Sequence, residues 1–164
     1  MNRVLNFMDV GACRRSCSAL GFESAQVILR VAGAIDTAEE RILKGFGEQV
    51  VFLRMGEGYT WETQNRERDT RVAQEAWAEV EKFLKDPGFG LIVLDELNIA
   101  IHHEYVSLKQ VLTAVGQRPP MQHVVITGRG ASPELIEAAD LVSEMKMIKH
   151  PFRKGIKAQA GIEF

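Results

Sequence analysis

The chain has 164 residues, of which 46% are hydrophobic and 26% are charged, and its formal net charge is −2. This length suits one folded domain, and we expect residues 1–164 to form a single one. The charge balance predicts no nucleic-acid partner, because such partners favour a strongly basic surface. No apolar run reaches the roughly 20 residues that span a bilayer, so we expect no membrane segment. Charged residues near the N-terminus interrupt any signal sequence, which indicates a cytoplasmic protein.

The two cysteines, Cys13 and Cys17, are too few for a disulfide framework. A zinc ion would need two further ligands, and the adjacent His102 and His103 point in different directions on any helix. We therefore interpret the cysteines as reduced thiols of a cytosolic protein.

The order of apolar and amphipathic segments predicts an α/β fold, with a mostly parallel sheet flanked by helices. The expected strands span residues 4–7, 50–53, 91–94, 123–127 and 141–145. The expected helices span residues 62–85, 107–115 and 133–140. The first of these helices has apolar residues at spacings of three and four and ends before Pro87. From Lys149 onward we expect a tail that is ordered only by packing on the domain or on a second copy.

A pair of carboxylates follows one of the buried strands. The apolar run 91–94 leads directly into Asp95 and Glu96, which is the pattern of a Walker B strand. Such a strand places a carboxylate where a nucleotide-bound Mg²⁺ would sit, at the carboxyl edge of a parallel sheet. The alternative is an ordinary strand end whose acid caps the next helix.

The next strand ends in Thr127-Gly128-Arg129-Gly130. Glycines allow the backbone to approach a ligand closely, and Arg129 offers a planar fork that suits a phosphate group. The alternative is an ordinary glycine turn with an arginine exposed to solvent.

A third segment, Gly58-Tyr59-Thr60-Trp61, places aromatic residues at alternating positions beside a glycine. Such side chains can stack on a flat ligand, or they can hold the loop against the core.

Together and in this order, several segments closely resemble the ATP:corrinoid adenosyltransferases of cobalamin synthesis and salvage. The resemblance covers roughly residues 34–164 and is carried by residues 58–64, 93–97, 118–120, 125–130, 149–152 and 155–164. It implies a P-loop NTPase-like (RecA-like) α/β fold, a homodimer and a flavoprotein as the source of reductant. The implied reaction transfers the 5′-deoxyadenosyl group of ATP, with Mg²⁺ or Mn²⁺, to the cobalt of a reduced corrinoid such as cobalamin, and releases triphosphate.

The resemblance also implies roles for individual residues. Tyr59 and Trp61 match the aromatic pair that packs on the corrin, with tyrosine in place of the commoner phenylalanine. Asp95 matches the acid beside the metal, Glu96 an acid beside the nucleotide, and Arg129 the arginine near the phosphates.

Residues 1–33 depart from the family pattern, which has a phosphate loop of the form G-N-G-K-G-K-[ST]-[ST]. Here Arg15 stands where the phosphate lysine would be, Ser16 occupies the position of the metal-binding hydroxyl, and Gly11 remains as a loop glycine. Only about a dozen residues separate Phe22 from Ala34, where the family fits the rest of a helix and a whole strand. We therefore expect the first strands to be truncated or atypical, through a degenerate copy or a shifted reading frame.

Three hypotheses about function follow. The first is an active adenosyltransferase in which Gly11, Arg15 and Ser16 bind the nucleotide and its metal. The second is a catalytically impaired corrinoid-binding relative that lacks a working phosphate loop. The third is an unrelated nucleotide-binding module.

Overall fold

The computed structural model describes residues 4–7, 25–30, 38–54, 65–149 and 154–157. The strands in this part of the chain are β1 (Val4–Phe7), β2 (Ala25–Arg30), β3 (Val50–Arg54), β4 (Phe89–Asp95), β5 (His123–Thr127) and β6 (Leu141–Ser143). The helices are α2 (Ala38–Lys44), α4 (Arg66–Lys85), α5 (Leu97–His102), α6 (Leu108–Gly116) and α7 (Pro133–Ala138), with a 3-10 turn η1 (Gly47–Gln49) before β3. Among these described helices, none is long and apolar enough to cross a membrane.

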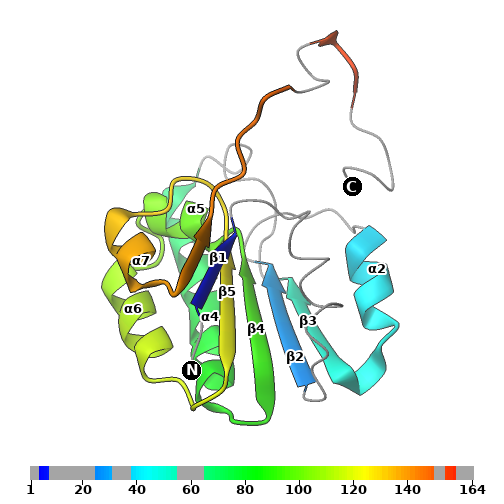
Figure 1. The fold of residues 1–164 in the computed structure, drawn as a ribbon, viewed down its shortest axis with the longest axis vertical. Coiled ribbons are helices and arrows are strands. Elements are labelled where there is room, and N and C mark those ends of the chain that lie inside the picture. Colours follow the sequence, from blue (N-terminus) through cyan, green and yellow to red (C-terminus); the bar gives the residue numbers. More distant parts are fainter. Residues whose placement is uncertain (1–3, 8–24, 31–37, 55–64, 150–153, 158–164) are drawn as a thin grey trace.

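The described strands form one sheet in the order β3-β2-β4-β5-β1-β6, and every neighbouring pair is parallel. Figure 1 shows the strands side by side with their arrowheads at one edge, so all their carboxyl ends meet there. The prediction of an α/β fold with a parallel sheet flanked by helices is confirmed. Ligands of open parallel sheets bind at the carboxyl edge, so a functional site is expected there.

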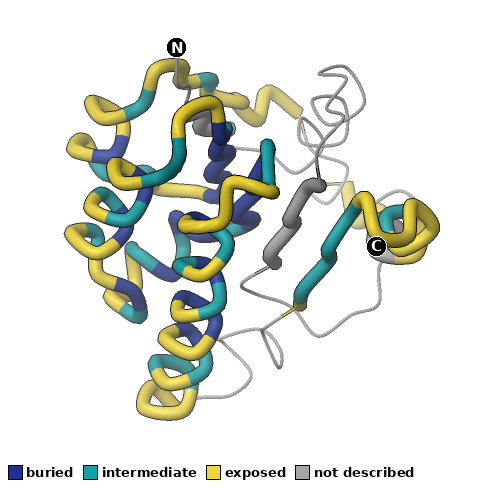
Figure 2. Tube along the Cα trace, turned by 90° about the horizontal axis from the view of Figure 1, so that it is seen from below, coloured by how far each residue is buried: buried dark blue, intermediate teal, exposed yellow. Residues whose placement is uncertain are grey.

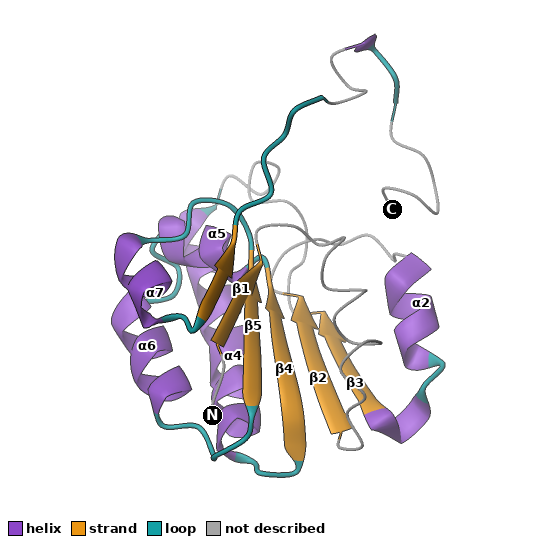
Figure 3. Ribbon diagram, viewed as in Figure 1, coloured by secondary structure: helices purple, strands orange, loops and turns teal. Residues whose placement is uncertain are grey.

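Helices cover both faces of the sheet (Figure 3). On one face, Trp77 and Leu84 of α4 pack in the same buried cluster as Ile92 and Leu94 of β4. On the other face, the alternate strand residues form a second cluster, against which Leu43 of α2 packs; its buried members are Leu91, Val93 and Val125. Because β4 is covered on both faces, its sequence is a continuous apolar run rather than an alternating one. In Figure 2, the buried positions gather where the helices meet the sheet.

The helix ends follow capping signals in the sequence. The Asn65 side chain accepts a hydrogen bond from the Arg68 backbone N–H at 3.0 Å, so α4 begins at Arg66 and not at residue 62 as we expected. Ser132 caps α7 by accepting from the Leu135 N–H at 3.2 Å, with Pro133 in the first turn.

The structure contains a strand before Ala34 that was not among the expected ones. Residues Ala25–Arg30 form β2, which lies between β3 and β4 and pairs with both along its length. Its run Val27-Ile28-Leu29 is the signal that could have predicted it. The last strand is also shorter than expected, because β6 ends at Ser143. Helices α2 and α5 were not predicted, and both are short.

Candidate functional site at the carboxyl edge

Two neighbouring strands end in polar side chains that contact each other. Asp95 is the last residue of β4 and Thr127 the last residue of β5, and they are 6% and 0% exposed. The Thr127 hydroxyl donates to Asp95 Oδ1 at 2.6 Å and accepts from the Glu96 backbone N–H at 2.9 Å. The aspartate predicted to bind a metal is therefore anchored at the carboxyl edge by the adjacent strand.

Glu96 makes the turn from β4 into α5. Its backbone is left-handed, with φ of 62°, a conformation that costs a non-glycine residue roughly 1–2 kcal/mol. Its side chain does not cap α5, because no side-chain hydrogen bond is made at that helix start. The alternative interpretation of the acidic pair, a strand end with a helix-capping acid, is therefore not supported at Glu96.

Gly128 continues from β5 and packs tightly against this turn. Its φ is 118°, and a Cβ atom there would lie 3.0 Å from Asn98 Cβ and 3.3 Å from Glu96 Cα. The Asn98 side-chain amide, buried in α5, donates to the Gly128 carbonyl at 3.1 Å. Glycine is required here because the backbone after β5 must approach the backbone after β4.

Arg129 follows directly and is exposed to solvent, between Gly128 and Gly130, whose φ is 70°. The structure thus brings three of the predicted site residues, Asp95, Glu96 and Arg129, to one edge of the sheet. Asn98 was not predicted as a site residue. Thr127 was part of a predicted motif, but no role was predicted for it. Both are polar residues beside a predicted strand end, and that position could have singled them out.

The other predicted site residues, Gly11, Arg15, Ser16, Tyr59 and Trp61, lie outside the described residues. The structure does describe the strands that precede these residues in the chain, β1 and β3. Strand β1 ends at Phe7 opposite Thr127, and β3 ends at Arg54, so both segments leave the sheet at the same carboxyl edge.

The segment Arg118–Pro120, which is part of the resemblance, has a structural role. The Arg118 guanidinium donates to the Val115 carbonyl at 2.7 Å, at the end of α6, and to the Gln122 carbonyl at 2.9 Å. Burial lowers the pKa of Arg118, while the nearby Asp140 carboxylate acts in the opposite direction. This arginine therefore stabilises the connection between α6 and β5, at the amino edge of the sheet and away from the candidate site.

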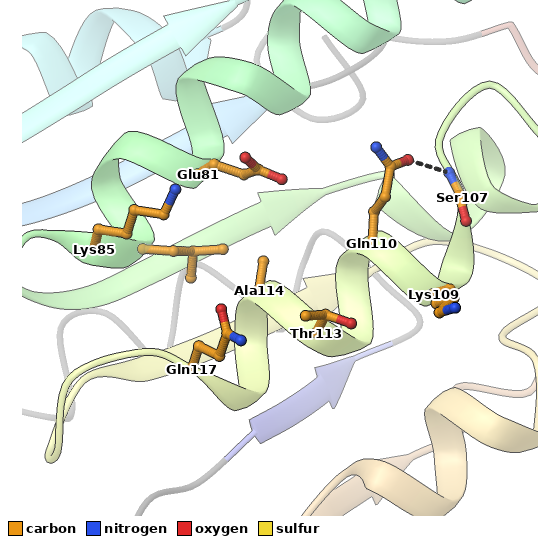
Figure 4. Close-up of a pocket in the computed structure, with 9 residues that line it drawn as sticks. Glu81, Lys85, Ser107, Lys109, Gln110, Thr113, Ala114 and Gln117 are labelled. Atoms are coloured by element: carbon orange, nitrogen blue, oxygen red, sulfur yellow. Dashed lines mark hydrogen bonds between the residues drawn. The ribbon is translucent and has the colours of Figure 1, made fainter.

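A groove of about 300 Å³ lies between α4 and α6. Figure 4 shows Glu81 and Lys85 of α4 on one side and Gln110, Thr113 and Gln117 of α6 on the other. Among the predicted site residues that the structure describes, Asp95, Glu96 and Arg129, none lines it. The groove belongs to the helical layer, and we assign the functional site to the carboxyl edge instead.

The fold places this chain among the open parallel α/β proteins, a class whose ligands bind at the carboxyl edge of the sheet. Comparison with known proteins gives the family. The sequence model described as "ATP:corrinoid adenosyltransferase BtuR/CobO/CobP" matches residues 13–164, and this chain belongs to that family. The resemblance found in the sequence is confirmed.

Several curated relatives support this assignment. A corrinoid adenosyltransferase of Pseudomonas aeruginosa is 54% identical over 84% of this chain and 68% of its own length. One from Sinorhizobium is 46% identical over 84% of this chain and 65% of its own length. The corrinoid adenosyltransferase CobA of Salmonella typhimurium is 40% identical over 84% of this chain and 69% of its own length. The matched region thus spans about two thirds of each of these relatives.

Proposed function

We propose that this protein transfers the 5′-deoxyadenosyl group of ATP to the cobalt of a reduced corrinoid, in the synthesis or salvage of adenosylcobalamin. The electron pair of Co(I) forms a bond to C5′ of ATP while the bond from C5′ to its oxygen breaks, and triphosphate leaves with that oxygen. The observation that carries the proposal is the anchored Asp95 beside Glu96 and Gly128, in a chain of the adenosyltransferase family.

In this proposal the protein mainly positions its two substrates, since the nucleophile is the corrinoid itself. Tyr59 and Trp61 pack on the corrin, and this contact helps displace the axial ligand so that the cobalt is easier to reduce. At the nucleotide, Glu96 and Arg129 lie beside the ribose and phosphates in a P-loop NTPase-like (RecA-like) arrangement. Gly11, Arg15 and Ser16 form the remaining phosphate site in residues 1–33.

The Asp95 end of β4 fits a magnesium ion that arrives with the nucleotide. Mg²⁺ prefers oxygen ligands and is usually held by one or two carboxylates together with phosphate oxygens and water. Asp95 provides such a carboxylate, and the described residues contain no group of three or more His, Cys, Asp or Glu that could enclose a metal by themselves. Asp95 and the Ser16 hydroxyl would hold the ion, which supplies charge neutralisation of the triphosphate when bound.

The proposal extends to assembly and location: a single domain over residues 1–164, a homodimer, a flavoprotein reductant and the cytoplasm. The edge strand β6 supports the homodimer, because Leu141 and Val142 on it are 47% and 37% exposed. Beyond the strand, Met147 and Ile148 are exposed as well. Exposed apolar residues on the outermost strand of the described sheet are typical of protein interfaces. Sedimentation of the purified chain tests this part.

The test of the activity uses the full chain with chemically reduced cob(I)alamin and Mg²⁺–ATP in the absence of oxygen. We expect adenosylcobalamin, recognised by its light-sensitive absorption spectrum, with one triphosphate released for each product molecule. A spectral change of cob(II)alamin on binding without turnover would instead select the impaired relative. ATP binding with no response to any corrinoid would select an unrelated nucleotide-binding module.

A further inference from the structure

The Thr127 hydroxyl joins the ends of β4 and β5 through two hydrogen bonds. It donates to Asp95 Oδ1 at 2.6 Å and accepts from the Glu96 backbone N–H at 2.9 Å. Thr127 is 0% exposed, so solvent water does not compete for either hydrogen bond.

The two bonds fix where the hydroxyl proton lies. Because Oγ1 of Thr127 accepts from an N–H that can only donate, its own proton is free to point at the Asp95 carboxylate. Hydroxyl-to-carboxylate bonds of about 2.5–2.7 Å are the short, charge-assisted kind, roughly twice as strong as neutral ones. The bond from Thr127 therefore holds the Asp95 carboxylate firmly.

The same bond also fixes the rotation of the carboxylate. The torsion that turns a carboxylate about its Cβ–Cγ bond is broad and roughly two-fold, so a free aspartate samples many orientations. Holding Oδ1 on Thr127 leaves Asp95 with one orientation, and with it one position for Oδ2.

We propose that Thr127 is a positioning residue that orients Asp95 for the Mg²⁺ of the nucleotide. The inference rests on the proposed function, because it concerns the same metal and nucleotide. Thr127 acts through Asp95 and itself touches neither the metal nor ATP.

The neighbouring contacts point the same way. Asn98 donates to the Gly128 carbonyl at 3.1 Å, so the residue after Thr127 is held against the helix that follows Asp95. The ends of β4 and β5 are thereby held together by Thr127 of β5 and by Asn98 of α5, so the hydroxyl cannot move past the carboxylate without breaking these contacts.

The test compares four versions of the full chain: the parent, Thr127→Val, Thr127→Ser and Val115→Ala. Valine keeps the shape of threonine without its hydroxyl, and serine keeps the hydroxyl. Val115 is buried in α6 and outside the carboxyl edge, so its replacement by alanine is a control for lost packing alone. The measurement is the Mg²⁺ concentration that gives half-maximal ATP binding, by calorimetry at fixed ATP, with thermal unfolding of each apoprotein recorded alongside.

For Thr127→Val we expect the required Mg²⁺ concentration to rise about tenfold, since loss of a partner that orients a metal ligand typically lowers metal affinity 10–100-fold. Thr127→Ser should stay within about twofold of the parent, and Val115→Ala should lower the unfolding temperature without changing the Mg²⁺ requirement. If Thr127→Val does not fold, Thr127→Cys replaces it, because a thiol is a similar size and a much weaker donor.

A Mg²⁺ requirement that is the same in the parent and in Thr127→Val, or that shifts equally in Val115→Ala, overturns the inference and leaves the proposed function intact. A parent that binds ATP without any dependence on Mg²⁺, or does not bind it, overturns both.

Discussion

Gly128 occupies a backbone conformation that other residues adopt only with strain. Its φ is 118°, and an added Cβ would meet Asn98 Cβ at 3.0 Å. We expect Gly128→Ala to lower the free energy of unfolding by about 1–3 kcal/mol, because both the dihedral angle and the contact oppose it.

Gly116 offers a matched control for this substitution. A Cβ there would meet nothing within 4 Å, and the residue ends helix α6. Gly116→Ala should change stability by less than about 1 kcal/mol, in the stabilising direction. Urea unfolding of both variants checks the pair, and equal stabilities would show that the turn after β5 adapts freely.

Asp95 is the residue on which the proposed metal site depends. Asp95→Asn keeps the shape of the side chain and removes its charge, so we expect ATP binding in the presence of Mg²⁺ to weaken at least tenfold while corrinoid binding is retained. Calorimetry with Mg²⁺–ATP and the absorption change of cob(II)alamin measure the two separately. Asp86→Asn removes the same charge at the end of α4, and its Mg²⁺–ATP affinity should match the parent. Unchanged affinity in Asp95→Asn would mean that Asp95 is an ordinary strand end.

At the scale of elements, the Gln122 side chain links α4, β4 and the approach to β5. It is 2% exposed, and its amide nitrogen donates to the backbone carbonyls of Phe83 at 3.2 Å, Asp86 at 3.0 Å and Phe89 at 3.1 Å. These carbonyls lie where α4 ends and β4 begins. This buried amide therefore adds side-chain hydrogen bonds to the backbone turn that precedes β4, the strand that carries Asp95.

Removing this amide should be costly. We expect Gln122→Ala to destabilise the protein by about 2–4 kcal/mol, since it removes the hydrogen bonds of a buried amide and leaves a cavity. The exposed Gln117 serves as the control, and Gln117→Ala should cost less than about 0.5 kcal/mol. Thermal or urea unfolding distinguishes the two, and a small loss in Gln122→Ala would mean that water replaces the amide.

At the scale of the whole molecule, the sheet joins residues far apart in the chain at one edge. Strand β1 pairs with β5, and β2 pairs with β4, so the strands before and after positions 8–24 both belong to the sheet. Strand β2 is present, so the departure from the expected glycine- and lysine-rich phosphate loop lies before Ala25.

We predict that replacing residues 8–24 with an intact glycine- and lysine-rich phosphate loop and its helix raises the rate of adenosylation at least tenfold. Consecutive glycine amides converge on phosphates without interference from Cβ atoms, and a misplacement of about 1 Å can cost on the order of 100-fold in rate. Formation of adenosylcobalamin measures the effect, and the same exchange combined with Asp95→Asn should lose most of the gain. A rate that does not change would show that Gly11, Arg15 and Ser16 already form a working phosphate site.

The sequence by itself determined the fold class and the elements with strong local signals. The apolar run ending in Asp95 and the helix start at Ser132 and Pro133 were predicted at the places where the structure has them. Continuous apolar runs specify buried parallel strands, and capping residues specify helix ends, because both depend on neighbours along the chain. Family membership likewise followed from motifs and their order.

Only the tertiary structure decided how the strands are ordered and which side chains meet. Strand β2 was missed because its six residues lie in an atypical segment, and its place between β3 and β4 depends on pairing with strands far along the chain. Thr127 and Asp95 are 32 residues apart, and their contact exists only because β4 and β5 lie side by side in register. Local propensity acts over a few residues. The order of the strands depends on how the whole chain buries its apolar faces, and the hydrogen bonds between strand ends depend on that order.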